Sequence, residues 1–179
     1  MIASTIAKRY ARALLLVARD SQQVDLYGNQ LKAFAELGET SPIFLAVLSD
    51  NHRDADIRKK LIGTFSAKLD LNKDVTQFLK LLVNKGRMSL LPIVSLEYQK
   101  MADAQMNRVP MTVVSAGPLA DAVYNDLMAD FGKKTGKTML LQKVVDEQVL
   151  GGVRVHVGDT VYDYTVKNQL DRLSEKMMG

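Results

Sequence analysis

The 179-residue chain is 47% hydrophobic and 25% charged, the composition of an ordinary globular protein. It contains no cysteine, which excludes disulfides and thiolate metal sites, and its apolar runs are too short to span a membrane. The net charge of +4 is too small to indicate nucleic-acid binding by itself. The excess positive charge lies in residues 1–105, which carry 15 Lys and Arg against 11 Asp and Glu, whereas residues 106–179 carry nine against nine.

Residues 1–105 are expected to form six short amphipathic helices that pack as a bundle. Apolar residues recur at helical spacing, beginning with Ile6, Tyr10 and Leu14. The strongest pattern covers residues 75–83, where they fall at i, i+3, i+4, i+7 and i+8. Turn and capping residues set the expected boundaries, which are a stop at Gly38, a start at Ser41-Pro42, a start at Asp54 or Asp56, a stop at Gly86, and a start at Ser89 with Pro92 in the first turn.

Residues 106–179 are expected to form a small α+β domain, so that the predicted fold is mainly α with an N-terminal six-helix bundle and an α+β C-terminal domain. The apolar period changes near Arg108, and "VRVHV" alternates strictly, with valines 153, 155 and 157 on one face and Arg154 and His156 on the other. The other expected elements are strands over 109–116, 138–145 and 160–163 and helices from 119 to about 132 and from Val166 through Leu170, Leu173 and Met177.

The stretch "GKKTGKT" (132–138) is similar to a phosphate-binding loop, whose pattern is G-x-x-x-x-G-K-[ST]. Only three residues separate the two glycines, one fewer than the pattern requires. A phosphate loop also joins a strand to a following helix, whereas a helix is predicted before this stretch and a strand after it. Gly132 is therefore interpreted as a helix stop and Gly136 as a turn. A nucleotide-binding enzyme that uses Lys137 remains as an alternative.

No catalytic, cofactor-binding or metal-binding residue is predicted. His52 and His156 are the only histidines, and their spacing fits no zinc motif and no hydrolase triad. The adjacent carboxylates Asp146 and Glu147 precede a Gly-Gly turn and are interpreted as solvated. A second alternative is a helical nucleic-acid-binding module, since the first helix and residues 58–60 are basic. Acidic residues are interleaved with these cations, and no aromatic platform is visible.

Two of the predicted helices have the pattern of a partner-binding groove. The first is rich in alanine, which permits close approach of another helix, and the fifth is apolar over most of its circumference, because Leu81 joins its stripe. A groove between two such helices can accept a helix from a partner.

Three stretches carry a resemblance to a known family, the delta subunit of F-type ATP synthases, which is called the oligomycin-sensitivity-conferring protein in mitochondria. They are "AKRYARALLLVA" (7–18), "FLKLLVNKGRMSLLPIVSLEYQKM" (78–101) and "VVDEQVLGGVRVHVGDTVYDYTVKNQLDRL" (144–173), and "VVSAGPL" (113–119) joins the last two. After "VYD" the family usually has glycine and serine, where this chain has Tyr164-Thr165. The chain also lacks the usual hydroxyl cap after Pro118, with Leu119-Ala120-Asp121 in its place.

The resemblance implies a non-catalytic stator subunit that links the catalytic head to the peripheral stalk, so that proton flow is coupled to rotary ATP synthesis. The bundle of residues 1–105 would hold the N-terminal helix of an alpha subunit between its first and fifth helices. The domain of residues 106–179 would bind the stalk b subunits, with contacts within 144–178. No cofactor and no nucleic acid are implied. The groove residues implied are Ala3, Ala7, Tyr10, Ala11, Leu14, Phe78, Leu79, Leu82 and Val83.

The expected location is peripheral, on the cytoplasmic face of a bacterial inner membrane. The N-terminal residues interleave basic and apolar side chains at helical spacing and show no transit or signal pattern. Association with the membrane would be indirect, through the complex.

Overall fold

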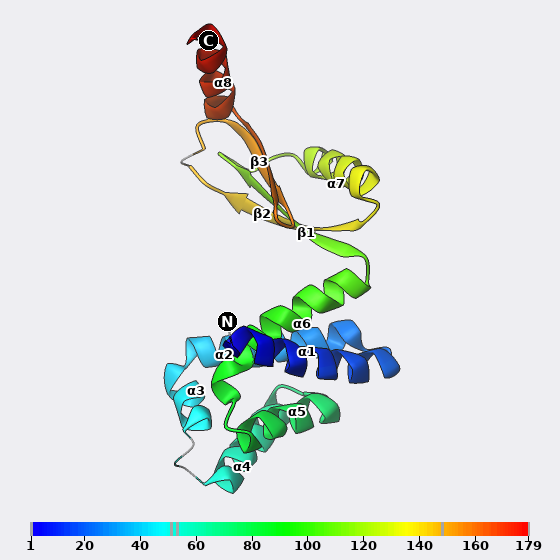
Figure 1. Ribbon diagram of the computed structural model, residues 1–179, viewed down its shortest axis with the longest axis vertical. Helices are drawn as coiled ribbons and strands as arrows, with labels where there is room; N and C mark the ends of the chain where they lie inside the picture. The colour runs from blue at the N-terminus through cyan, green and yellow to red at the C-terminus, as the bar shows by residue number, and fades with distance from the viewer. Residues whose placement is uncertain (1, 51, 53, 148, 179) are drawn as a thin grey trace. The chain divides into compact units, whose positions relative to one another are not determined.

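The computed structural model describes residues 2–50, 52, 54–147 and 149–178. The chain divides into two compact units, Met1–Ala102 and Asp103–Gly179, of which the first is helical and the second mixed (Figure 1). Helices and a short 3-10 turn occupy the described residues before the first strand. Their bounds are α1 (Ile2–Asp20), α2 (Val24–Thr40), α3 (Pro42–Ser49), α4 (Ala55–Lys68), α5 (Lys73–Asn84), η1 (Met88–Leu90) and α6 (Leu91–Gln105).

Several helix boundaries follow the sequence signals. The Asp54 side chain accepts a hydrogen bond from the backbone N–H of Asp56 at 2.8 Å, which caps α4. Helix α5 ends in a Schellman motif. Gly86, at φ 62°, donates to the Val83 carbonyl, and Arg87 donates to the Leu82 carbonyl. The predicted starts at Asp54 and Pro42 and the predicted stop at Gly86 are therefore confirmed.

Two predicted boundaries in this unit are wrong. Helix α2 continues past Gly38 to Thr40, and Gly38 is buried inside the helix beside Leu45 of α3. Ser89 does not cap α6, since it lies inside the 3-10 turn η1, and α6 begins at Leu91.

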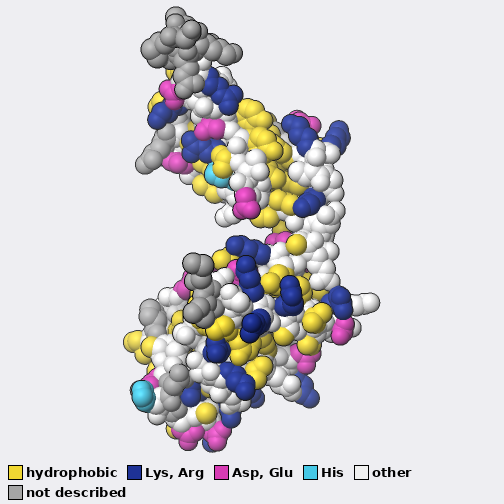
Figure 2. Space-filling model, in the orientation of Figure 1, with side chains coloured by type: hydrophobic (Ala, Val, Ile, Leu, Met, Phe, Trp, Pro, Cys, Tyr) yellow, Lys and Arg dark blue, Asp and Glu magenta, His cyan; other side chains and the backbone are white. Residues whose placement is uncertain are grey.

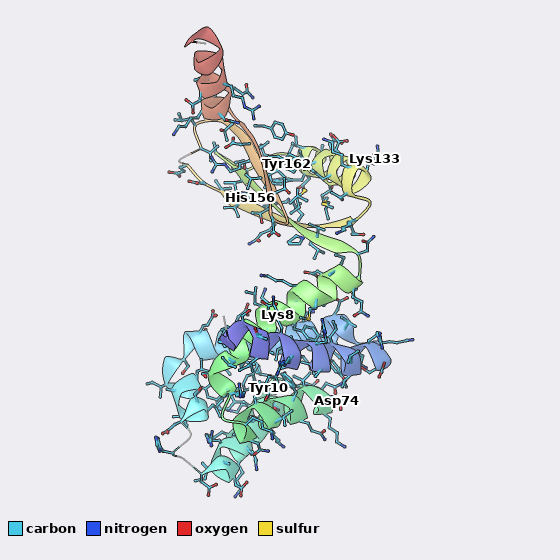
Figure 3. The ribbon with its side chains drawn as sticks, in the orientation of Figure 1. Lys8, Tyr10, Asp74, Lys133, His156 and Tyr162 are labelled. Carbon is cyan, nitrogen blue, oxygen red and sulfur yellow. The ribbon has the colours of Figure 1, made fainter. Side chains whose placement is uncertain are left out.

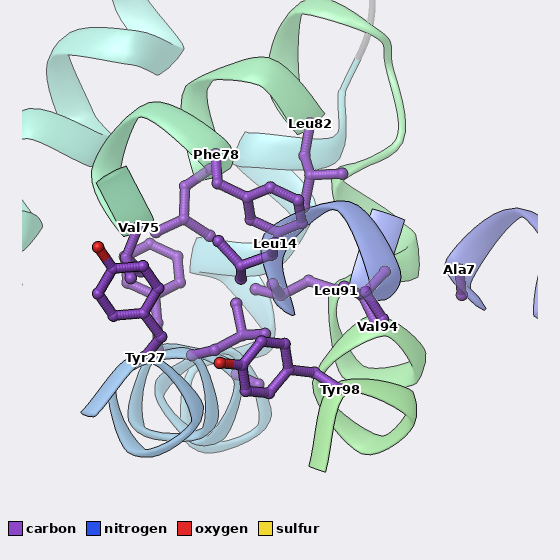
Figure 4. Packing of buried hydrophobic residues seen from close by; sticks show 14 of the residues in the cluster. Ala7, Leu14, Tyr27, Val75, Phe78, Leu82, Leu91, Val94 and Tyr98 are labelled. Atoms are coloured by element: carbon purple, nitrogen blue, oxygen red, sulfur yellow. The ribbon is translucent and has the colours of Figure 1, made fainter. Parts of the chain in front are cut away.

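The core of the first unit gathers the buried faces of these helices. Leu14 of α1 and Val75 and Phe78 of α5 belong to one buried cluster with Tyr27 of α2 and Tyr98 of α6 (Figure 4). The Tyr98 hydroxyl donates to the Val24 carbonyl at 2.9 Å, so its polar end is satisfied inside the core. Burial raises the pKa of Tyr98, and the phenol therefore stays protonated.

The described residues of the second unit form a four-stranded sheet and two helices. The elements are β1 (Arg108–Ser115), α7 (Asp121–Thr135), β2 (Thr138–Val145), β3 (Gly152–Val157), β4 (Thr160–Thr165) and α8 (Val166–Met178). Strands β1 and β2 are parallel and joined through α7, whereas β1–β3 and β3–β4 are antiparallel, in the order β2-β1-β3-β4.

Helix α7 covers one face of this sheet. Its Tyr124 and Phe131 are buried with Met111, Val113 and Val155 in a second core. The predicted alternation of β3 is confirmed, because its valines face this core while Arg154 and His156 point to the other face and are partly exposed. Helix α7 passes through Gly132 and ends at Gly136, whose φ of 67° is left-handed and whose N–H donates to the Gly132 carbonyl. Gly132 is therefore not the stop that the sequence predicted.

The junction between β4 and α8 contains Thr165, one of the two residues at which the chain departs from the family resemblance. The Thr165 hydroxyl donates to Asp163 Oδ1 at 2.6 Å and accepts from the N–H of Asn168 at 3.3 Å, as an N-cap residue does. Arg154 Nε donates to Asp163 Oδ2 at 3.0 Å. Thr165 therefore supplies a capping hydroxyl at the start of α8. The side chains of Leu173 and Met177, which were expected to extend the stripe of this helix, lie outside the described residues.

Candidate partner-binding groove

Helices α1 and α5 run antiparallel in the first unit. The Ser21 hydroxyl at the end of α1 donates to Tyr27 Oη, and Tyr27 Oη donates to Asp74 in the first turn of α5. At the opposite end, Ile6 of α1 lies beside Arg87, which follows α5. Figure 3 marks Tyr10 midway along α1 and shows Asp74 of α5 near the carboxyl-terminal end of α1.

A groove of about 790 Å³ lies between these two helices. Its apolar surface comes from both helices, and the rings of Tyr10 and Phe78 meet edge to face with centroids 6.3 Å apart. Val17 and Leu81 line the groove and are 46% and 42% exposed, so it presents large apolar side chains to solvent. The lining residues are Ile6, Arg9, Tyr10, Ala13, Leu14, Val17, Asp74, Gln77, Phe78, Lys80, Leu81, Asn84 and Arg87.

Only part of the predicted residue set reaches the groove surface. Tyr10, Leu14 and Phe78 line it, and Ala3 lines a second hollow of about 450 Å³ that continues it past Ile6 and Arg87. The remaining five belong to the core beneath the groove, because they occupy the inner faces of their helices. These five, each no more than 1% exposed, are Ala7, Ala11, Leu79, Leu82 and Val83.

The lining residues absent from the prediction lie beside the buried stripes. Leu81 and Val17 are apolar, exposed and one position away from buried neighbours. The sequence signal for such residues is an apolar stripe that is wider than a core-facing helix needs, and Leu81 widens the stripe of α5 in this way.

Charged side chains border the apolar groove. Arg9, Lys80 and Arg87 line it and form no ion pair with any residue that the structure describes. Figure 2 shows basic side chains around an apolar surface on the helical unit. Asp74 is the one carboxylate among the described residues that line the groove, and it accepts from Tyr27 Oη at 2.6 Å. Burial and then this hydrogen bond raise the pKa of Tyr27, so the phenol remains the donor.

Several exposed apolar side chains of the other unit lie around the junction of β4 and α8. Leu150 is 81% exposed and Leu170 59% exposed, and the Val166 side chain lies close to Gly151. We call this set the junction patch, and its members are Leu150, Tyr164, Val166 and Leu170.

Comparisons with known proteins identify the family. The family model described as ATP synthase delta (OSCP) subunit matches residues 6–177. The ATP synthase subunit delta of Geobacter metallireducens is 33% identical over 175 residues, 98% of this chain and 97% of that protein. The same subunit of Solidesulfovibrio magneticus is 33% identical over 179 residues, 99% and 98% of the two chains.

The chain belongs to the ATP synthase delta (OSCP) subunit family. A chain in the cryo-electron microscopy structure of the Toxoplasma gondii mitochondrial ATP synthase hexamer has the same fold, with a TM-score of 0.68 at 19% identity over 97% of each chain. As a delta (OSCP) subunit, the protein is a non-catalytic stator component that links the catalytic head to the peripheral stalk.

Among the residues that the structure describes, no cluster of three or more His, Asp or Glu could hold a metal, and no helix is long and apolar enough to cross a membrane. In this chain the stretch 132–138 covers the end of α7 and the beginning of β2. The order of elements is the reverse of a phosphate loop, and Lys133 and Lys134 lie in the last turn of α7, where cations interact favourably with the helix dipole.

Proposed function

We propose that the groove between α1 and α5 binds the N-terminal helix of an alpha subunit and that the junction patch contributes to binding of the stalk b subunits. In this proposal the helices of residues 1–105 act as one six-helix bundle on the catalytic head, and residues 106–179 form the stalk-binding domain. The protein then joins head to stalk on the cytoplasmic face of a bacterial inner membrane.

The observation that carries the proposal is the exposed apolar lining of the groove. Single exposed apolar side chains are common, but Val17 and Leu81 lie with five further apolar lining residues in one trough. The groove and its continuation follow α1 from Ala3 to Val17, which is about 21 Å of helix. A partner helix of about four turns fills that length, and burying its apolar face supplies the affinity.

Leu81→Asp tests the groove. Leu81 is 42% exposed, so a carboxylate there leaves the core intact and places a charge against the apolar face of a bound helix. We expect the affinity for the alpha-subunit N-terminal peptide to fall by at least about tenfold, since burying an unpaired charge costs more than about 1.4 kcal/mol. Isothermal titration calorimetry measures it.

Leu96→Asp is the matched control, because Leu96 is 56% exposed on α6 and does not line the groove. It should bind as the unmodified protein does. Thermal melts of both variants establish that each is folded. Unchanged affinity in a folded Leu81→Asp protein would show that the groove is not the binding site.

Leu170→Asp tests the junction patch. We expect weaker binding of a soluble b-subunit fragment and unchanged binding of the alpha-subunit peptide. The control is Ile43→Asp in the first unit, where Ile43 is 79% exposed. Equal binding of the b-subunit fragment by the two variants would show that the junction patch does not contact the stalk.

A further inference from the structure

The charges along the groove are unevenly distributed. Asp74 lies at the end formed by the last turns of α1 and the first turn of α5. Arg87 lies at the other end, beside Ile6, and Arg9 is close by on α1, one turn beyond Ile6. Lys80 follows Asp74 by six residues on α5 and lies between the two ends. One end of the groove is therefore acidic, and the remainder is basic.

These charges are available to a partner. The three cations form no ion pair with any other described part of the chain. The carboxylate of Asp74 accepts a hydrogen bond from the hydroxyl of the buried Tyr27, which holds it in place. It forms no ion pair within the described residues, so its negative charge is not neutralised by them. Tyr27 thus holds a carboxylate at one end of an apolar trough.

A bound helix responds to such a gradient because it carries a dipole. Its N-terminal turn has a partial positive charge and its C-terminal turn a partial negative charge. The lower-energy placement sets the N-terminal turn near Asp74 and the C-terminal turn near Arg87. Cations stand on both walls, Arg9 on α1 and Lys80 on α5, so acidic side chains on both flanks of the apolar stripe are also favoured.

We infer that the groove selects one orientation and one charge pattern in its partner. The partner is an amphipathic helix of about four turns with acidic flanks, and it docks with its N-terminus at Asp74 and its C-terminus at Arg87. This inference rests on the proposed function. It adds the direction of the bound helix, which runs parallel to α5 and antiparallel to α1.

Spin-labelled peptides report the direction. The alpha-subunit N-terminal peptide is prepared with a nitroxide on its first or its last residue and added to the ¹⁵N-labelled full chain. The N-terminal label should attenuate the amide signals of Gln77 and Val17, and the C-terminal label those of Ile6 and Arg87. The opposite pattern, or equal attenuation at both ends by either label, overturns the orientation while leaving the proposed function in place. No perturbation of any groove amide overturns both.

Charge-removing variants test the cause. Arg87→Gln should weaken peptide binding about threefold, and Asp74→Asn by a similar factor, because each removes one exposed interaction with the peptide. The asparagine keeps an oxygen that accepts from Tyr27. Arg12→Gln, on α1 but outside the groove lining, is the control and should change affinity by less than about twofold. Equal affinities for Arg87→Gln and Arg12→Gln would overturn the electrostatic selection.

Discussion

Alanine at position 152 places a methyl group where the structure has no room. Gly152 begins β3 at φ +80°, and a Cβ there would lie 2.4 Å from the Tyr164 carbonyl oxygen and 3.0 Å from Thr165 Cα. Both neighbours are backbone atoms of the paired strand β4, so no side-chain rotation relieves the overlap. The left-handed backbone costs alanine about 1–2 kcal/mol, and shifting β4 costs roughly a further 1–3 kcal/mol. We expect a total loss of about 2–5 kcal/mol in the free energy of unfolding of the second unit.

Urea unfolding followed by circular dichroism measures the loss, and hydrogen exchange of the β3 and β4 amides locates it. Gly63→Ala is the matched control, because Gly63 lies inside α4 and no neighbouring atom lies within 4 Å of the place that the added methyl group would occupy. The free energy of unfolding of Gly63→Ala should rise by about 0.5–1 kcal/mol, since alanine is the better helix former. A Gly152→Ala protein as stable as the unmodified chain, with unchanged exchange in β3, would show that the steric conflict does not exist.

Two further predictions concern the cap of α8. Thr165→Ala removes the hydroxyl that accepts from Asn168 and should lower stability by about 1 kcal/mol, with faster hydrogen exchange in the first turn of α8; exchange equal to that of the unmodified protein would contradict the cap. The hydrogen bonds from Thr165, and then Arg154, lower the pKa of Asp163 to about 2. The ionised Asp163 therefore stabilises the folded state fully above its usual pKa of 3.8, and this contribution is lost as the pH falls toward 2. Melting temperatures at about pH 5 and about pH 2.5 should therefore differ less for Asp163→Asn than for the unmodified chain; an equal difference would exclude Asp163 as a source of acid sensitivity.

The positions of most elements could be predicted from the sequence because their signals are local. The stripes of α1 and α5, the start of α3 at Pro42 and the alternation of β3 depend on neighbours a few residues away. Glycine boundaries were less predictable, since a glycine can serve tertiary packing. Gly38 is buried inside α2 beside Leu45 of α3, and α7 passes through Gly132 because Gly136 provides the left-handed end.

The location of the groove could be predicted, but its surface could not. The sequence shows which residues of α5 are apolar, whereas the packing of the other helices decides that Leu79 is core and Leu81 is exposed. The link between Tyr27 and Asp74 joins residues 47 positions apart, and no local pattern signals it.

Photo-crosslinking in the assembled ATP synthase would show directly what occupies the groove. A benzophenone side chain replaces Leu81 in the groove or, as the control, Leu96 on α6, and the complex is irradiated in membranes. Mass spectrometry then identifies the crosslinked chain. We expect the probe at position 81 to crosslink to the N-terminal segment of an alpha subunit and the probe at position 96 not to do so. Crosslinking from position 81 to another subunit, or none in an intact complex, would contradict the proposed role of the groove.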